Sequence, residues 1–247
     1  NFDAVADQTV SVSTTDDDVA GFTIVELEGS TSVSEAGSTD TFTVVLDAQP
    51  DTNVILSIIS GDTGEATVTS SLTFTSANWD TAQTVTVTGV DDHLVDGTET
   101  TTISVAVVDV ASDDNFDAVA DQTVSVSTTD DDVAGFTVTE TDGSTSVTEA
   151  GGTDTFTVVL NAQPDSDVVV AITSSDNGEA SSNSPLTFTS SNWDTPQTVT
   201  VTGVDDFLID GTIASDLVVA IVDASSDNNF DAVADQTVSV STTDDDA

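Results

Sequence analysis

Residues 122–132 read QTVSVSTTDDD, an alternating run of polar and apolar residues followed by three adjacent aspartates. Alternation of this kind places Val124 and Val126 on one face of a β-strand and the serines and threonines on the other. The aspartates that follow are ionised, and two such charges ~4 Å apart repel by about 1 kcal/mol even in bulk water. The stretch therefore predicts a strand that ends where a cation is needed.

The chain repeats this stretch at a fixed spacing. Residues 1–18 recur without change as 115–132 and 229–246, a period of 114. That period is too long for a solenoid repeat and long enough for a domain with its own core. We therefore expect a segment of a tandem array, in which 1–18 is the C-terminal strand of a preceding repeat, 19–132 is a first β-sandwich repeat and 133–247 is a second.

Strand signals dominate each repeat. Seven runs rich in Val, Ile, Thr and Phe are separated by Gly, Pro, Asn and Asp, and no helical period is present. In the first repeat these runs are 22–27, 41–46, 54–59, 66–75, 84–90, 102–108 and 119–128. Seven strands without helices predict an all-β fold in the form of tandem β-sandwiches.

The alternation also predicts the core. The expected core residues are Phe22, Phe42, Val44, Ile58, Leu72, Phe74, Val85, Val87, Ile103, Val105, Val124 and Val126, each with a counterpart 114 residues later. Trp79 and Trp193 each follow a strand, and we expect them to pack on the core or at its edge rather than to form an aromatic platform for a sugar.

The composition is extreme in charge. Forty-six acidic residues face no Lys or Arg and a single His, and there is no Cys. A field of this sign repels nucleic acid and anionic membranes and attracts metal cations. Neither a disulfide nor a thiolate metal site is available. No apolar run approaches the ~20 residues that span a bilayer, so we expect no membrane insertion by this segment.

Strand order predicts where the acids gather. Consecutive antiparallel strands bring the loops of Glu35, Asp62 and residues 91–96 to one end of the sandwich, beside the aspartate run. The predicted metal ligands are Glu35, Asp62, Asp91, Asp92, Asp96, Asp130, Asp131 and Asp132, and in the second repeat Glu149, Asp176, Asp205, Asp206, Asp210, Asp244, Asp245 and Asp246. Asp16, Asp17 and Asp18, the first copy of the run, are further candidates.

Calcium is the cation that such a set suits best. Ca²⁺ takes six to eight oxygen ligands at ~2.3 to 2.6 Å, whereas Mg²⁺ keeps its waters and rarely fills an all-protein cage. These acids recur between the repeats, while others drift: Asp47 becomes Asn161, Asp114 becomes Asn228 and Glu99 becomes Ile213. His93 is replaced by Phe207, so it cannot be a ligand that both repeats share.

These motifs resemble those of two known groups. Ser34-Glu35-Ala36-Gly37, Asp91-Asp92 with Asp96-Gly97, and a strand running into the aspartates look like the Calx-β pattern. Residues 72–80 through 83–91 resemble the tandem extender domains of large bacterial RTX adhesins. The resemblance implies an immunoglobulin-like, Greek-key sandwich whose acids bind several Ca²⁺ ions at domain poles and interdomain linkers. It departs at Asp96 and Asp210, where Calx-β domains often carry Glu.

Three functions can be compared. The first is a calcium-stabilised extender of an extracellular, cell-surface RTX adhesin, which holds a distal binding domain away from the cell in adhesion and biofilm formation, with neighbouring repeats as its partners. The second is a glycan- or ice-binding module that uses threonine-lined strands, although exposed Thr is ordinary in strands. The third, an enzyme, is disfavoured because the chain has no Cys, Lys or Tyr nucleophile and its one His is not repeated. We expect no catalysis and no small-molecule substrate.

Overall fold

The computed structural model describes residues 6–246, which form β-strands and three-residue 3-10 helices. No helix in this range has the length and apolarity that a bilayer crossing needs. The described chain divides into two compact units. One consists of residues 6–33, 39–88 and 100–126, and the other of residues 34–38, 89–99 and 127–246. The expected repeat boundary after residue 132 stays a prediction, and the outer ends of the expected segments, 1–5 and 247, lie outside the described residues.

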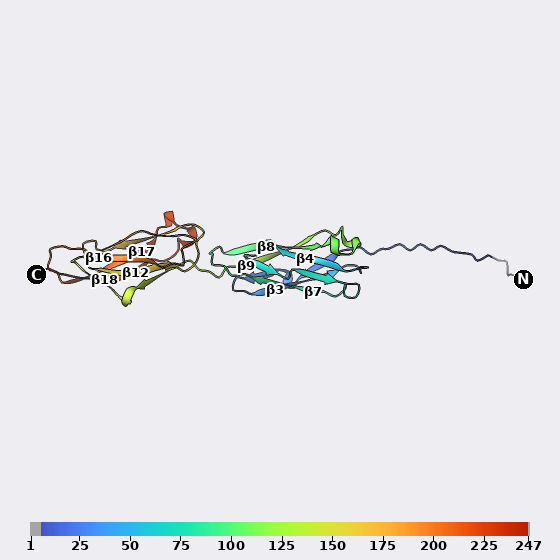
Figure 1. The fold of residues 1–247 in the computed structure, drawn as a ribbon, viewed down its shortest axis with the longest axis horizontal. Helices are drawn as coiled ribbons and strands as arrows, with labels where there is room; N and C mark the ends of the chain where they lie inside the picture. The colour runs from blue at the N-terminus through green and yellow to red at the C-terminus, as the bar shows by residue number, and fades with distance from the viewer. Residues whose placement is uncertain (1–5, 247) are drawn as a thin grey trace. The chain divides into compact units, whose positions relative to one another are not determined.

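The strands up to β9 form one sandwich of two sheets. The four-stranded sheet has the order β1-β3-β7-β5 and the five-stranded sheet the order β2-β9-β8-β4-β6, so that β3 and β7 lie in one layer and β8 and β4 in the other (Figure 1). The strands are β1 (Phe22–Glu26), β2 (Thr31–Ser34), β3 (Thr39–Leu46), β4 (Val54–Ser60), β5 (Ala66–Val68), β6 (Ser71–Phe74), β7 (Gln83–Gly89), β8 (Thr98–Val107) and β9 (Gln122–Thr129). Short 3-10 helices η1 (Leu27–Gly29), η2 (Asp109–Ala111) and η3 (Asp114–Phe116) lie between them.

The second sandwich repeats this plan. Its sheets have the orders β10-β12-β16-β14 and β11-β18-β17-β13-β15. The strands are β10 (Phe136–Glu140), β11 (Thr145–Thr148), β12 (Thr153–Leu160), β13 (Val168–Ser174), β14 (Ala180–Ser182), β15 (Leu186–Phe188), β16 (Gln197–Gly203), β17 (Thr212–Ile221) and β18 (Gln236–Thr243). The 3-10 helices are η4 (Thr141–Gly143), η5 (Asp223–Ser225) and η6 (Asn228–Phe230). The predicted all-β sandwich class is therefore confirmed.

The strand count was wrong in two places, because each sandwich has nine strands rather than seven. Strand β2 was not predicted, because its four residues contain only one apolar side chain, Val33, and so show no clear alternation. The expected strand 66–75 is two strands, β5 in the four-stranded sheet and β6 in the five-stranded sheet. The chain crosses between sheets at Thr69 and Ser70. The N–H of Thr69 donates to the carbonyl of Thr86 in β7, and the carbonyl of Ser70 accepts from the N–H of Ile58 in β4. A continuous apolar and Thr-rich run does not reveal such a crossing.

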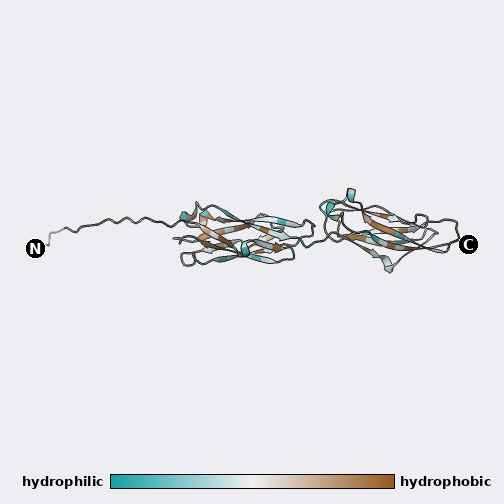
Figure 2. Cartoon of the chain, turned by 180° about the vertical axis from the view of Figure 1, so that it is seen from behind, coloured by the Kyte–Doolittle hydropathy of each residue, from teal (hydrophilic) through white to brown (hydrophobic). Residues whose placement is uncertain are grey.

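Each sandwich has its own core between the sheets. All twelve predicted core residues of the first repeat, and all twelve counterparts in the second, are buried. Figure 2 shows hydrophobic residues spread along the strands of both sandwiches, with hydrophilic residues interleaved. Trp79 and Trp193 are partly buried and pack against these cores, as expected.

Gly203, the last residue of β16, lies where the backbone of another strand passes very close. A Cβ at Gly203 would overlap the carbonyl of Thr148 at the end of β11, and a Cβ at Gly89 would overlap the carbonyl of Ser34 in the same way. Glycine therefore lets β11 and the residue that follows it, Glu149, approach β16.

Replacement of this glycine should destabilise the second sandwich. Gly203→Ala forces one backbone away from another, and we expect a loss of about 1 to 3 kcal/mol in the free energy of unfolding, the usual cost of overpacking. Urea unfolding of the whole chain would measure it. Gly178→Ala is the control, because a Cβ there meets only the movable carboxylate of Asp176, at 3.1 Å. Equal stability of the two variants would contradict the close approach.

Candidate metal centre at the sandwich pole

Six acidic residues of the second sandwich lie at one pole, beside the ends of β11, β16 and β18 and the start of β14. Strand β11 pairs in parallel with β18, with Thr148 opposite Thr243, and the N–H of Glu149 donates to the carbonyl of Thr243 at 3.1 Å. Glu149 therefore lies beside the aspartates that follow β18. We call Glu149, Glu179, Asp206, Asp210, Asp244 and Asp246 the second-repeat pole.

Two groups of carboxylates at this pole have the spacing of ligands around one ion. Glu149, Asp206 and Asp246 each offer an oxygen, and these oxygens lie within 4.8 Å of one another. Glu179, Asp206 and Asp210 do the same. Oxygens on opposite sides of a Ca²⁺ ion with bonds of ~2.4 Å are ~4.8 Å apart, so either group is compact enough to share one cation. Asp206 belongs to both groups.

Buried carboxylates at this pole lack partners among the described residues. Glu149 is 1 % exposed, and neither of its side-chain oxygens takes part in a hydrogen bond. One oxygen of Glu179, which is 5 % exposed, and one of Asp246 are also buried without a partner. Unsatisfied buried carboxylates are costly in a folded protein. A cation bound in each of the two groups would satisfy these oxygens, and carboxylate oxygens are the donors that a hard cation prefers.

Protonation is the other way to avoid leaving a buried carboxylate charged and without a partner. Burial raises the pKa of Glu149 from 4.5 to about 7, and the charges of Asp244 and Asp210 add to the rise. Burial also raises the pKa of Glu179 and of Asp246, again with neighbouring carboxylates contributing. The pole therefore disfavours negative charge unless a cation accompanies it.

Asp244 organises the loop between β16 and β17 rather than joining a ligand group. Its Oδ2 accepts hydrogen bonds from the N–H of Gly211 at 2.9 Å and of Asp210 at 3.1 Å. Its Oδ1 accepts from the N–H of Asp246 at 2.7 Å. These bonds hold the pKa of Asp244 below its usual range. They also fix the backbone of Asp210 and Asp246, whose carboxylates belong to the compact groups.

The first repeat has an equivalent set at its pole. Glu35, Asp92 and Asp132 form one compact group. Burial raises the pKa of Asp132, an effect that His93 opposes and Asp130 reinforces. Asp130 takes the place of Asp244, since its carboxylate accepts from the N–H of Gly97 at 2.9 Å and of Asp132 at 2.6 Å. Burial, with the charge of Asp92 adding to it, also raises the pKa of Asp96, which stands 114 residues before Asp210.

The predicted ligands thus separate into those that the structure gathers and those that it does not. Glu35, Asp91, Asp92, Asp96, Asp132, Glu149, Asp206, Asp210 and Asp246 belong to compact groups. Within residues 6–246, Asp62, Asp130, Asp131, Asp176, Asp205, Asp244 and Asp245 belong to none. Asp62 and Asp176 instead accept from the N–H of Gly64 and Gly178, at 2.8 and 2.9 Å, and shape their own turns. Metal ligation by any of these residues stays a prediction.

Sequence reasoning missed Glu179 and its counterpart Glu65. Both directly precede short strands, β14 and β5, and both are buried. The carbonyl of Glu179 accepts from the N–H of Val204 at 2.9 Å, which ties it to the loop of Asp206. The signal was present in the sequence, because the Gly-Glu-Ala triplet recurs unchanged at 64–66 and 178–180.

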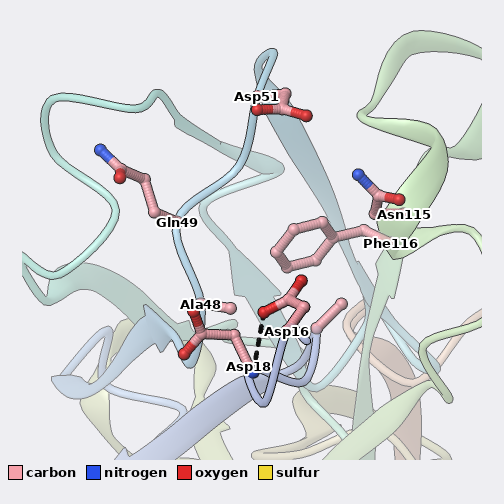
Figure 3. A pocket seen from close by; sticks show the side chains of 8 residues that line it. Asp16, Asp18, Ala48, Gln49, Asp51, Asn115 and Phe116 are labelled. Carbon is pink, nitrogen blue, oxygen red and sulfur yellow. Dashed lines mark hydrogen bonds between the residues drawn. The ribbon is translucent and has the colours of Figure 1, made fainter. Parts of the chain in front are cut away.

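The first copy of the aspartate run lies at the opposite end of the first sandwich. Asp16 and Asp18 line a hollow of about 340 Å³ together with Asp51, Gln49 and Asn115 (Figure 3). The N–H of Asp18 donates to Asp16 at 3.1 Å, the same local bond as in the other two copies of the run. Asp17 does not line this hollow. Asp16, Asp17 and Asp18 belong to no compact ligand group in the described chain.

The metal-free protein should lose stability as the pH rises from 4.5 to about 7. With the pKa of Glu149 raised to about 7, the folded state holds a proton that the unfolded state releases above 4.5. This contribution to the free energy of unfolding is fully present below pH 4.5 and is lost as the pH passes 7. The pKa values of Asp113 and Asp244 are lowered from 3.8, so these two groups change the pH dependence of stability only below pH 3.8, outside this window.

Thermal melts in EDTA across this window would measure the effect. Glu149→Gln cannot titrate at this position, so its stability should depend less steeply on pH than that of the wild type. A melting temperature that rises with pH in EDTA would contradict the reasoning.

No family model and no curated protein sequence matches the chain. Among solved structures, calcium binding domain CBD12 of CALX1.1 is 15 % identical with a TM-score of 0.33, over 80 % of this chain and 80 % of that one. The apo-form Calx CBD1 domain has the same identity and TM-score, over 45 % of this chain and 98 % of its own. Domains 4–9 of surface layer protein SbsC are 20 % identical with a TM-score of 0.29, over 90 % of this chain and 31 % of that one. Similarities at these TM-scores decide neither a family nor a ligand.

Proposed function

We propose that this chain is a calcium-stabilised structural extender from the surface of a bacterial cell, part of an RTX-type adhesin that presents a distal binding domain. The observation that carries the calcium assignment is Glu149, a buried glutamate whose two oxygens lack hydrogen bonds and face other carboxylates. With no Lys or Arg in the sequence, neutralisation has to come from solution. The donor set is all oxygen, which favours Ca²⁺ over softer metals.

A comparison of the acidic positions that differ between the two repeats with those that stay acidic supports a cation at the pole. Asp47 accepts a hydrogen bond from Thr23 at 2.7 Å, and Asn161 accepts the equivalent bond from Thr137 at 2.8 Å. An amide oxygen serves there as well as a carboxylate, because the partner is a neutral hydroxyl. At the pole, Glu35, Asp92 and Asp132 recur as Glu149, Asp206 and Asp246, all still acidic. Retained charge is expected where the partner is itself charged.

The spacer role rests on repetition and on the shortness of the connection. Only Val133, Ala134 and Gly135 stand between the aspartate run and β10. A metal ion that holds Asp132 would restrict this connection, and near-identical repeats in series serve distance better than recognition. The partners are then the neighbouring repeats, the location is extracellular, and the segment has no catalytic role. The resemblance to RTX extender domains points the same way.

Calcium should restrict the relative motion of the two repeats. With Ca²⁺ bound, solution scattering should give a narrower distance distribution than in chelator, because repulsion between free carboxylates and an unrestrained connection would broaden it. Asp132→Ala should behave partly like the chelated protein even in calcium.

The control for this experiment is Asp194→Asn, which removes one exposed charge outside the compact ligand groups. It should scatter like the wild type in both conditions. Identical profiles with and without calcium would remove the stiffened-spacer role while leaving calcium binding within each repeat intact.

A further inference from the structure

His93 is the only histidine in the chain, and it lies at the pole of the first repeat. It belongs to the loop between β7 and β8, two residues after Asp91. Asp91, His93 and Asp132 each offer one ligand atom, and these three atoms lie within 4.8 Å of one another. The group therefore combines an imidazole nitrogen with two carboxylate oxygens.

This donor set differs in kind from the carboxylate groups. Ca²⁺ takes oxygen ligands, whereas Zn²⁺ binds imidazole nitrogen at ~2.0 to 2.1 Å and carboxylate oxygen at ~2.0 to 2.2 Å. Three protein ligands with a water in the fourth position form a complete zinc site. The three ligand atoms, within 4.8 Å of one another, are close enough for small side-chain movements to bring them to the ~3.4 Å spacing of tetrahedral zinc ligands.

A second observation points to a ligand at this place. The Oδ2 atom of Asp132 is buried and has no hydrogen-bond partner among the described residues. Asp132 also belongs to the group with Glu35 and Asp92, so the two groups share this carboxylate. In the second repeat the place of His93 is taken by Phe207, which is 88 % exposed and offers no donor.

We propose that Asp91, His93 and Asp132 form a site for a borderline divalent transition metal, for which Zn²⁺ is the probe, in the first repeat alone. The site lies beside the proposed calcium position, with which it shares Asp132, and it is selective because an imidazole replaces an oxygen donor. The two repeats, which are alike in their carboxylate groups, thus differ in the metals that they bind.

The single histidine makes the test direct. In saturating Ca²⁺, which occupies the all-oxygen positions, Zn²⁺ is titrated into the whole chain while the imidazole resonances are followed by NMR and heat by calorimetry. We expect the resonances to shift and to saturate at one equivalent of Zn²⁺. His93→Phe, which copies the second repeat, should lose this binding event, and Phe207→His should gain a second one.

Imidazole resonances that do not respond to Zn²⁺ would overturn the proposal, and the contact of the His93 ring with that of Trp193 would then be a packing interaction. Zinc binding of equal strength in wild type and His93→Phe would overturn it as well, as would a Phe207→His variant that gains nothing. Calcium-dependent melting of each variant is measured alongside. It reports on the fold and on the proposed calcium function separately, because His93 belongs to no all-oxygen group.

Discussion

Excess EDTA is expected to lower the melting temperature of the calcium-loaded chain by on the order of 15 to 30 °C. A ligand that binds only the folded state adds ~4 kcal/mol per site when its concentration is a thousandfold above Kd. For a domain of roughly 100 residues, 1 kcal/mol corresponds to ~4 to 8 °C. At the second-repeat pole, the buried carboxylates of Glu149, Glu179 and Asp246 repel one another once the metal is removed, and relief of this repulsion is part of the binding free energy.

The matched control replaces Ca²⁺ by an equal ionic strength of NaCl, which screens repulsion without filling a coordination site. Mg²⁺ is the second control, and we expect it to restore less stability than Ca²⁺ because it dehydrates reluctantly. A melt that is the same in calcium and in chelator would remove the calcium assignment. A melt restored fully by NaCl would reduce the effect to screening of surface charge.

The second large effect is expected from one substitution in the second repeat. Asp206 contributes to both carboxylate groups at that pole, so Asp206→Asn should abolish calcium binding there and leave the first repeat able to bind. Calorimetry should show the loss of about half of the binding events. In calcium, the second sandwich should lose the stabilisation of its metal, again ~4 kcal/mol per site under the same excess.

In EDTA, Asp206→Asn should no longer lower the stability of the second sandwich and should slightly raise it. Without metal, Asp206→Asn removes one charge from a crowded set, so the variant should be at least as stable as the wild type. Asp194→Asn, which removes an exposed charge outside these groups, should change little in either condition. A variant destabilised equally in calcium and in EDTA would indicate that Asp206 acts through folding alone, as its bond from the N–H of Leu208 at 2.6 Å would allow.

Much of the candidate site could be predicted because loop positions follow from strand order. The antiparallel alternation was enough to gather Glu149, Asp206, Asp210 and Asp246 at one end. It could not separate Asp206, which faces other carboxylates, from Asp244, which bonds three backbone N–H groups. That distinction depends on which way a carboxylate turns, and the backbone that it meets comes from a distant loop.

Glu179 was missed for a related reason. In the sequence it lies between a turn and the polar residues Ser181 to Ser184, and only the recurrence of the Gly-Glu-Ala triplet, not its own neighbours, distinguishes it from an exposed glutamate. It is buried because β14 pairs with β16, whose following loop carries Asp206. The parallel pairing of β11 with β18, which places Glu149 beside the aspartate run, was likewise invisible, since parallel partners can lie far apart in the chain.

Alternation and composition are local properties, and they were sufficient to predict the all-β class, the period, the acidic charge and the buried face of the seven strands that were expected. Tertiary structure decided whether a given run becomes a strand at all. The octapeptide QTVSVSTT forms β9 at 122–129 and β18 at 236–243, whereas its first copy, at 8–15, forms no strand in the described chain. Val10 and Val12 there are 85 % and 81 % exposed, while Val124 and Val126 are 2 % and 0 % exposed. Identical residues differ because a strand needs neighbours: β9 lies between β2 and β8, which satisfy its backbone groups and bury its valines, and residues 8–15 pair with no strand among the described residues.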